Sequence, residues 1–105
     1  MDGLKKARAS KRRVFSVALN ALKAEYNSST KTAESIEVHL NLLEDKESKL
    51  EAVHAEILQL LQNDPDCTEE EYDEEYAEIE EYRDRFIKWS TKAKNYVMEG
   101  KSSQE

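Results

Sequence analysis

The side chains that could perform acid, base or metal chemistry are few and scattered in this sequence. The chain has two histidines and one cysteine among 105 residues. His39 and His54 are 15 residues apart, without the i, i+4 spacing or H-E-x-x-H motif that places two imidazoles on one zinc ion. Glu51 and His54 form one E-x-x-H unit, whereas a di-metal bundle needs such units on two facing helices. We therefore expect no metal site and no cofactor.

Nucleophilic chemistry is equally poorly supported. The single thiol, Cys67, lies between Asp66 and Thr68 in an acidic setting that disfavours the thiolate. One cysteine excludes an internal disulfide, so nothing requires an oxidising compartment, and we expect a cytoplasmic protein. The sequence holds no glycine-rich phosphate loop and no defensible Ser-His-Asp or Cys-His arrangement. We predict a non-enzymatic protein without a small-molecule substrate.

Phosphate binding is a further possibility, because positive charge gathers at the N-terminus. Residues 1–13 hold six bases against one acid. The candidate nucleic-acid contacts are Lys5, Lys6, Arg8, Lys11, Arg12 and Arg13. No aromatic platform or recognition motif accompanies these bases, so we favour a role in neutralising acids within the fold. A less favoured alternative is an amphipathic transit peptide, because residues 1–24 contain only one acid.

Negative charge dominates the rest of the chain. Residues 32–81 have a net charge of -16, and residues 68–81 contain nine acids and no base. Residues 82–105 return to +3. The acidic run 69–82 keeps Tyr72, Tyr76 and Ile79 at helical spacing, so we interpret it as the solvated face of an amphipathic helix. Antiparallel folding would bring the basic N-terminus beside these acids.

The elements that must position these side chains are helices. Two glycines and one proline cannot supply the turns of a sheet, and Ala, Leu, Glu and Lys favour helix. Breaker-rich segments at 27–32 and 63–68 divide the chain, and Thr68 followed by Glu71 forms a capping box. We predict an all-α protein, an elongated antiparallel three-helix bundle with helices at about 3–27, 31–63 and 69–98.

The same reading sets the limits of the domain. We expect one helical domain over residues 1–98 and a disordered tail over 99–105. No apolar stretch approaches the roughly 20 residues that span a bilayer, so we expect no membrane span.

Apolar residues recur at alternating steps of four and three, which predicts a coiled-coil seam on each helix. The middle seam is Ile36, Leu40, Leu43, Glu47, Leu50, His54, Ile57 and Leu61, and the last is Tyr72, Tyr76, Ile79, Arg83, Phe86, Ser90, Ala93 and Val97. The first is weaker: Leu4, Ala7, Lys11, Val14 or Phe15, Ala18, Leu22 and Tyr26. If the chain folds back at the two turns, Lys11, Glu47 and Arg83 meet. We therefore predict a polar layer of these three residues inside the seam, which would fix the register of the helices.

A second stripe widens the apolar face of the last helix. Tyr82, Trp89 and Tyr96 follow one another at steps of seven. This face is broader than a short first helix is expected to cover. We therefore predict that the stripe contacts another protein, either a second copy or a partner.

The order of these features resembles a known family. LKKARASKRRVFSVALNAL, LLEDKESKLEAVHAEILQL and EEEYDEEYAEIEEYRDRFIKWSTKAKNYV are similar to the N-terminal helical region of Gag polyproteins of BEL/Pao-type retrotransposons. The family pattern is a basic R-x-S-x-K-x-x-x-T/S helix, an I/L-x-x-L heptad helix and an acidic helix ending on R-x-x-F/Y. The matching residues are Arg8, Ser10, Arg12, Ser16, Glu75, Glu78, Arg83, Phe86 and Lys92. The resemblance covers about residues 4–98.

What the resemblance implies is a non-catalytic Gag segment that lies upstream of capsid, zinc-knuckle and enzyme regions, none of which has a signature in this chain. Its role would be self-association or positioning of the polyprotein. Two alternatives remain beside this interpretation. One is a nucleic-acid-binding module that uses residues 5–13, and the other is a cytoskeletal or trafficking adaptor coiled coil.

Overall fold

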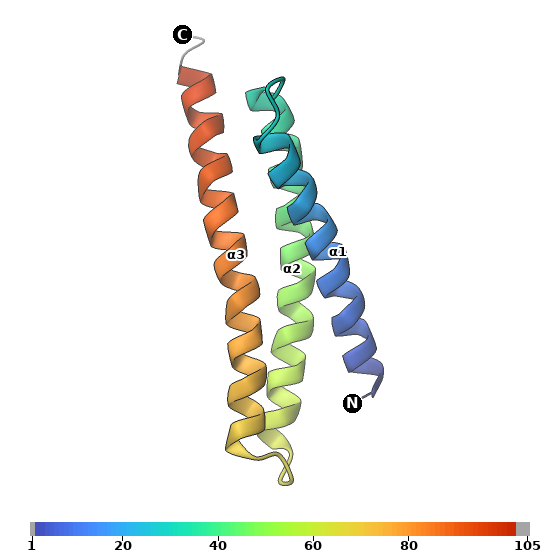
Figure 1. Cartoon of the computed structure of the whole chain (residues 1–105). Helices are drawn as coiled ribbons and strands as arrows, with labels where there is room; N and C mark the ends of the chain where they lie inside the picture. Colours follow the sequence, from blue (N-terminus) through green and yellow to red (C-terminus); the bar gives the residue numbers. More distant parts are fainter. Residues whose placement is uncertain (1, 103–105) are drawn as a thin grey trace.

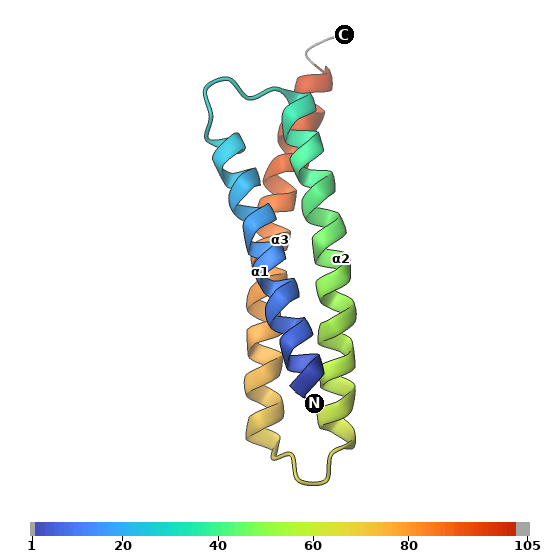
Figure 2. The same ribbon diagram turned by 90° about the vertical axis from the view of Figure 1, so that its right-hand side faces the viewer.

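The computed structural model describes residues 2–102, and in that range the protein consists of three helices and no strand. They are α1 (Asp2–Tyr26), α2 (Ala33–Asn63) and α3 (Glu69–Ser102). Consecutive helices run antiparallel; α2 lies between α3 and α1 in Figure 1, whereas α1 and α3 both lie on one side of α2 in the turned view of Figure 2. The extents of 58 × 20 × 18 Å describe an elongated bundle. The predicted all-α class and antiparallel arrangement are confirmed.

Side-chain caps define where α2 and α3 begin. Thr32 accepts a hydrogen bond from the Ser35 backbone N–H at 3.0 Å, and the Ser35 hydroxyl accepts one from the Thr32 N–H at 2.9 Å. This capping box satisfies backbone donors that the first turn leaves over. Thr68 caps α3 in the predicted position, because its hydroxyl accepts from the Glu71 N–H at 3.1 Å.

The end of α3 differs from the prediction. The helix continues to Ser102 rather than stopping at 98, so residues 99–102 are helical where a disordered tail was expected. Gly100 explains the difference, since a Cβ at this position would lie only 2.8 Å from the Cβ of Ala33. The missing side chain lets α3 pass close to the start of α2. Residues 103–105 of the expected tail lie outside the described range.

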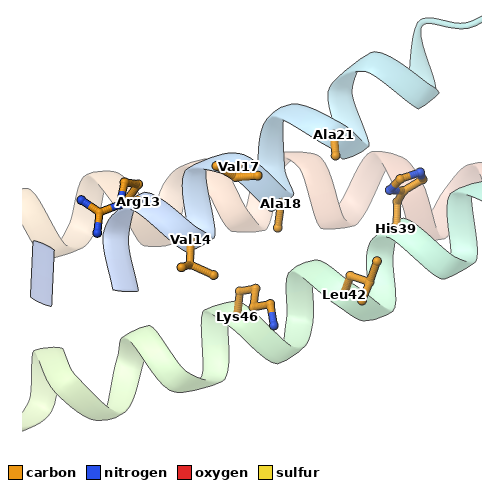
Figure 3. A pocket seen from close by; sticks show the side chains of 8 residues that line it. All are labelled: Arg13, Val14, Val17, Ala18, Ala21, His39, Leu42 and Lys46. Atoms are coloured by element: carbon orange, nitrogen blue, oxygen red, sulfur yellow. The ribbon is translucent and has the colours of Figure 1, made fainter. Parts of the chain in front are cut away.

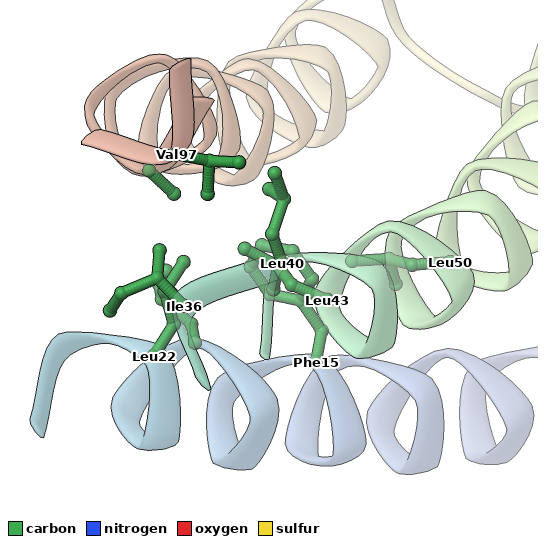
Figure 4. Packing of buried hydrophobic residues seen from close by; sticks show 9 residues of the cluster. Phe15, Leu22, Ile36, Leu40, Leu43, Leu50 and Val97 are labelled. Atoms are coloured by element: carbon green, nitrogen blue, oxygen red, sulfur yellow. The ribbon is translucent and has the colours of Figure 1, made fainter. Parts of the chain in front are cut away.

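Apolar side chains from all three helices form the core (Figure 4). The buried apolar residues are Phe15, Leu19, Leu22, Ile36, Leu40, Leu43, Leu50, Ile57, Ile79, Ala93 and Val97. Every buried position of α2 belongs to the predicted seam, as do the buried positions of α3. Burial of this apolar area supplies the main stabilisation of the bundle.

The seam of α1 contains the predicted Phe15 and Leu22 but is shifted by one position elsewhere, where Arg8, Arg12 and Leu19 replace Ala7, Lys11 and Ala18. Arg8, Arg12, Phe15, Leu19 and Leu22 follow at alternating steps of four and three, and the three apolar members are buried. The sequence favoured Lys11 over its neighbour because the apolar residues of this helix are sparse. The structure uses the arginines, whose long side chains reach the acids of α3.

Candidate functional site

The basic face of α1 meets the acidic start of α3 in a cross-helix charge network. Arg8 Nη1 lies 2.6 Å from Glu75 Oε1, and Arg12 Nη2 lies 3.2 Å from the same oxygen. Arg12 also contacts Glu78 at 3.0 Å and lies over the ring of Tyr82. Two of the six candidate nucleic-acid contacts are therefore engaged inside the fold, as the charge-neutralising interpretation requires.

His54 forms the buried end of this network. Its side chain is 1% exposed, and its Nε2 accepts a hydrogen bond from Arg12 Nε at 3.1 Å. Burial, and then the neighbouring Arg12 charge, lower the pKa of His54 from 6.5 to about 4. The ring is neutral at pH 7 and carries its proton on Nδ1, which has no hydrogen-bond partner among the described residues. His54 is a core residue rather than a surface base.

The other basic candidates face solvent or its edge. Lys5, Lys6 and Arg13 are exposed, and Lys11 is half-buried. Within residues 2–102, no ion pair involves any of the four. The solvent-facing positive charge of α1 is thus smaller than the sequence count implies.

The predicted polar layer of Lys11, Glu47 and Arg83 forms only in part. Lys11 is absent from it, and Arg83 is bound by a different glutamate from the one predicted. Glu47 and Arg83 line the same surface hollow beside Phe86, as the register of the second turn predicted. The carboxylate that binds Arg83 is Glu51, with two hydrogen bonds of 2.9 and 2.8 Å. Lys11 does not join this group, because Glu47 faces the α2–α3 side of the bundle.

Two neighbouring carboxyl groups in this hollow have opposite proton affinities. Burial and the adjacent Glu51 raise the pKa of Glu47 from 4.5 to about 7. Hydrogen bonds from Arg83 hold the pKa of Glu51 below its usual value. Ionising both carboxyl groups would place two negative charges beside a single guanidinium, which costs free energy. Glu51, the carboxylate bound to Arg83, therefore keeps its charge.

The aromatic stripe of Tyr82, Trp89 and Tyr96 makes contacts within the chain. All three pack against the core from its edge. The Tyr82 ring lies edge-on to Phe15 at 5.8 Å, and Tyr26 contacts Trp89 at 5.7 Å and Tyr96 at 6.1 Å. Contacts from α1 thus reach all three rings, which are half-buried, so the premise that a short first helix leaves this face uncovered is wrong.

A groove between α1 and α2 leaves apolar side chains uncovered and has a volume of about 440 Å³ (Figure 3). Its lining residues are Arg13, Val14, Val17, Ala18, Ala21, His39, Leu42 and Lys46. Val17 is 66% exposed and Leu42 is 49% exposed, which is unusual for large aliphatic side chains. Arg13 and Lys46 lie toward one end and His39 toward the other (Figure 3).

Sequence reasoning missed this groove, although a signal for it is present. Residues 14–22 (VFSVALNAL) contain no charge in a chain of which 37% is charged. The core uses only one side of this run, namely Phe15, Leu19 and Leu22. Val14, Val17 and Ala21 therefore form a second apolar row on the other side of α1.

Other chemistry finds little support among the described residues. Residues 2–102 contain no group of three or more potential metal ligands. Burial and the acids Glu71 and Asp64 raise the pKa of the Cys67 thiol, which agrees with the unreactive setting expected for it. Over the same range, none of the helices combines the length and apolar character needed to cross a bilayer.

Comparison with protein families, with curated proteins and with solved structures finds no match to this chain. A functional conclusion therefore rests on the groove, the charge network and the pattern of the sequence.

Proposed function

We propose that this chain is a non-catalytic helical module that associates with other protein chains, chiefly with further copies of itself. The observation that supports this is the apolar groove between α1 and α2, which stays exposed after the bundle has covered its aromatic stripe. A contiguous apolar surface of this kind is typical of protein interaction sites.

A finer proposal follows from the pattern of residues 4–98. The module would be a Gag-derived assembly segment of a BEL/Pao-type retrotransposon, acting in the cytoplasm. The basic first helix, the heptad helix and the acidic third helix support this origin. An open reading frame that continues into capsid and polymerase regions would establish it, whereas an unrelated genomic context would contradict it.

Self-association is tested by the mass of the full chain in solution. Light scattering and sedimentation equilibrium across a wide concentration range should show the mass rise from 12.2 kDa toward its double. A strictly monomeric chain at the highest concentration would contradict the proposal.

Nucleic-acid binding is the second candidate, supported by the exposed side chains of Lys5, Lys6 and Arg13. Phosphate contacts by these bases would give salt-sensitive binding to RNA. Reversing the charges of Lys11, Arg12 and Arg13 tests three of the bases predicted from the sequence. Reversing the charges of Lys5, Lys6 and Arg13 tests the three that the structure leaves exposed. Arg12 is held inside the fold, so reversing its charge should also lower stability. If the exposed bases contact RNA directly, the second variant should lose RNA binding while its stability stays near that of the parent.

A further inference from the structure

We infer that the α1–α2 groove is where a second copy of this chain docks, antiparallel to the first, so that α1 lies on α1 and α2 lies on α2. This inference rests on the proposed self-association and specifies the surface and geometry that produce it. Three features of the groove lead to it: the uncharged run along one wall, the opposite charges toward its two ends, and the apolar side chains exposed along its rim.

Neutrality is the first feature. The molecule has a net charge of -7, so two copies repel each other over most of their surfaces. The uncharged run 14–22 forms one wall of the groove, and Val38 and Leu42 lie exposed on the other. Contact through this face brings two copies together where the repulsion is smallest.

The charges around the groove select the direction of the second copy. Arg13 and Lys46 lie toward one end, and the exposed Glu34 lies beyond the other, in the first turn of α2. A parallel arrangement would set Arg13 of each copy against Lys46 of the other. A two-fold axis perpendicular to the helices separates these bases and brings each basic end onto an acidic end.

The spacing along α2 specifies an ion pair. Glu34, Val38, Leu42 and Lys49 follow at steps of four, four and seven, and all four side chains are exposed. Leu42 lies eight residues from Glu34 and seven from Lys49. When two α2 helices cross antiparallel at Leu42, Lys49 of one copy, whose Nζ lies 3.0 Å from Asp45 within its own chain, comes opposite Glu34 of the other.

The second copy would also cover Val17 on α1. Val17 is 66% exposed and projects from the uncharged wall of the groove, so it lies in the contact face of each copy.

The test measures dimer dissociation by sedimentation velocity for the full chain and three variants. Val17→Glu places a carboxylate in the contact face of each copy and should raise the dissociation constant by about tenfold or more. Ile87→Glu is the matched control, since Ile87 is 62% exposed on α3, away from the groove. It should leave dimerisation unchanged, and circular dichroism should show that both variants keep their helices.

The direction of docking has its own test. Lys49→Glu should weaken the dimer, and adding Glu34→Lys to that variant should restore it. A dimer that is unaffected by Val17→Glu, or a double variant as weak as Lys49→Glu, would overturn the inference and leave self-association standing. A parent chain that stays monomeric would overturn both.

Discussion

At the scale of single residues, two titratable side chains make the bundle respond to pH in opposite directions. His54 is buried as a neutral ring against Arg12, and Glu47 is held partly protonated beside Glu51. The first favours the folded state at high pH and the second at low pH. Their effects overlap between about pH 4.5 and 6.5, so substitutions are needed to separate them.

The contribution of His54 is lost in acid. Its pKa falls from 6.5 in the unfolded chain to about 4 in the fold, so the unfolded chain binds this proton first as the pH falls. Stabilisation is complete above pH 6.5 and is lost as the pH falls toward 4, by at most about 3 kcal/mol. His54→Leu should remove this slope from urea denaturation measured across the range. His39→Gln should retain it, and an unchanged slope in His54→Leu would contradict the expectation.

The contribution of Glu47 is lost in base. Its pKa rises from 4.5 to about 7, so its stabilisation is complete below pH 4.5 and is lost as the pH rises through 7. Glu47→Gln mimics the protonated group and should stabilise the protein at pH 8 by about 1 kcal/mol, with little effect at pH 4. Urea denaturation at the two pH values checks this. The exposed Glu44→Gln is the control, and equal effects of the two substitutions would refute the assignment.

At the scale of helices, α1 and α3 are joined by long side chains, whereas α2 packs directly on both. The guanidinium groups of Arg8 and Arg12 reach Glu75, and aromatic rings fill the space further along. At the far end, Gly100 lets the backbones of α3 and α2 approach. The contribution of each contact to stability can be tested by a substitution at one of its residues, compared with a control substitution elsewhere in the chain.

Arg12 rather than Lys11 should stabilise the bundle. Arg12→Gln leaves Glu75 short of one partner and removes the donor to His54, so it should lower the free energy of unfolding by about 2 kcal/mol. Lys11→Gln should change it by less than about 0.5 kcal/mol. Urea denaturation of both variants at pH 7 checks the shifted seam, and a larger loss for Lys11→Gln would contradict it.

The two glycines should respond oppositely to the same change. At Gly3 an added Cβ meets nothing within 4 Å, so Gly3→Ala should stabilise α1 by about 0.5 kcal/mol. At Gly100 the Cβ would lie 2.8 Å from the Ala33 Cβ, so Gly100→Ala should destabilise by about 1 kcal/mol despite its better helix propensity. Thermal unfolding measures both. Combining Gly100→Ala with Ala33→Gly should recover most of the loss, and the absence of recovery would argue against the close approach.

At the scale of the whole molecule, aromatic contacts join the end of α1 to α3, and the groove between α1 and α2 stays exposed. Tyr26 lies between Trp89 and Tyr96, and Lys31 lies over the Tyr26 ring at 4.3 Å. These contacts hold the end of α1 against α3. An exposed apolar groove lies between α1 and α2, where the second copy is proposed to dock.

Removing Tyr26 should loosen this closure. Tyr26→Ala should lower the free energy of unfolding by about 2 to 3 kcal/mol and expose Trp89 to water. Tryptophan fluorescence should shift to longer wavelength, and hydrogen exchange should accelerate first in α1. The control Tyr76→Ala removes an aromatic side chain that is 45% exposed, and should leave the Trp89 emission unchanged. Identical spectra for Tyr26→Ala and the parent would show that Tyr26 does not shield Trp89.

The sequence by itself determined the helices, their antiparallel order and most of the core. Pro65 and the caps at Thr32 and Thr68 mark the boundaries locally, and the heptad steps of α2 state which side is buried. These features act over one or two helical turns, so they can be read along the chain. The neutralisation of the basic N-terminus was also foreseeable, because the antiparallel order places it beside acids.

Only the tertiary structure decided which side chains meet across helices. A shift of one residue rotates a helix position by about 100°, so Lys11 and Arg12 cannot be told apart where the apolar pattern is sparse. The width of the face that α1 covers depends on how the helices cross, and for this reason the aromatic stripe proved internal. The exposed groove is what remains after that crossing is set, and no local pattern could assign Val17 and Leu42 to a common surface.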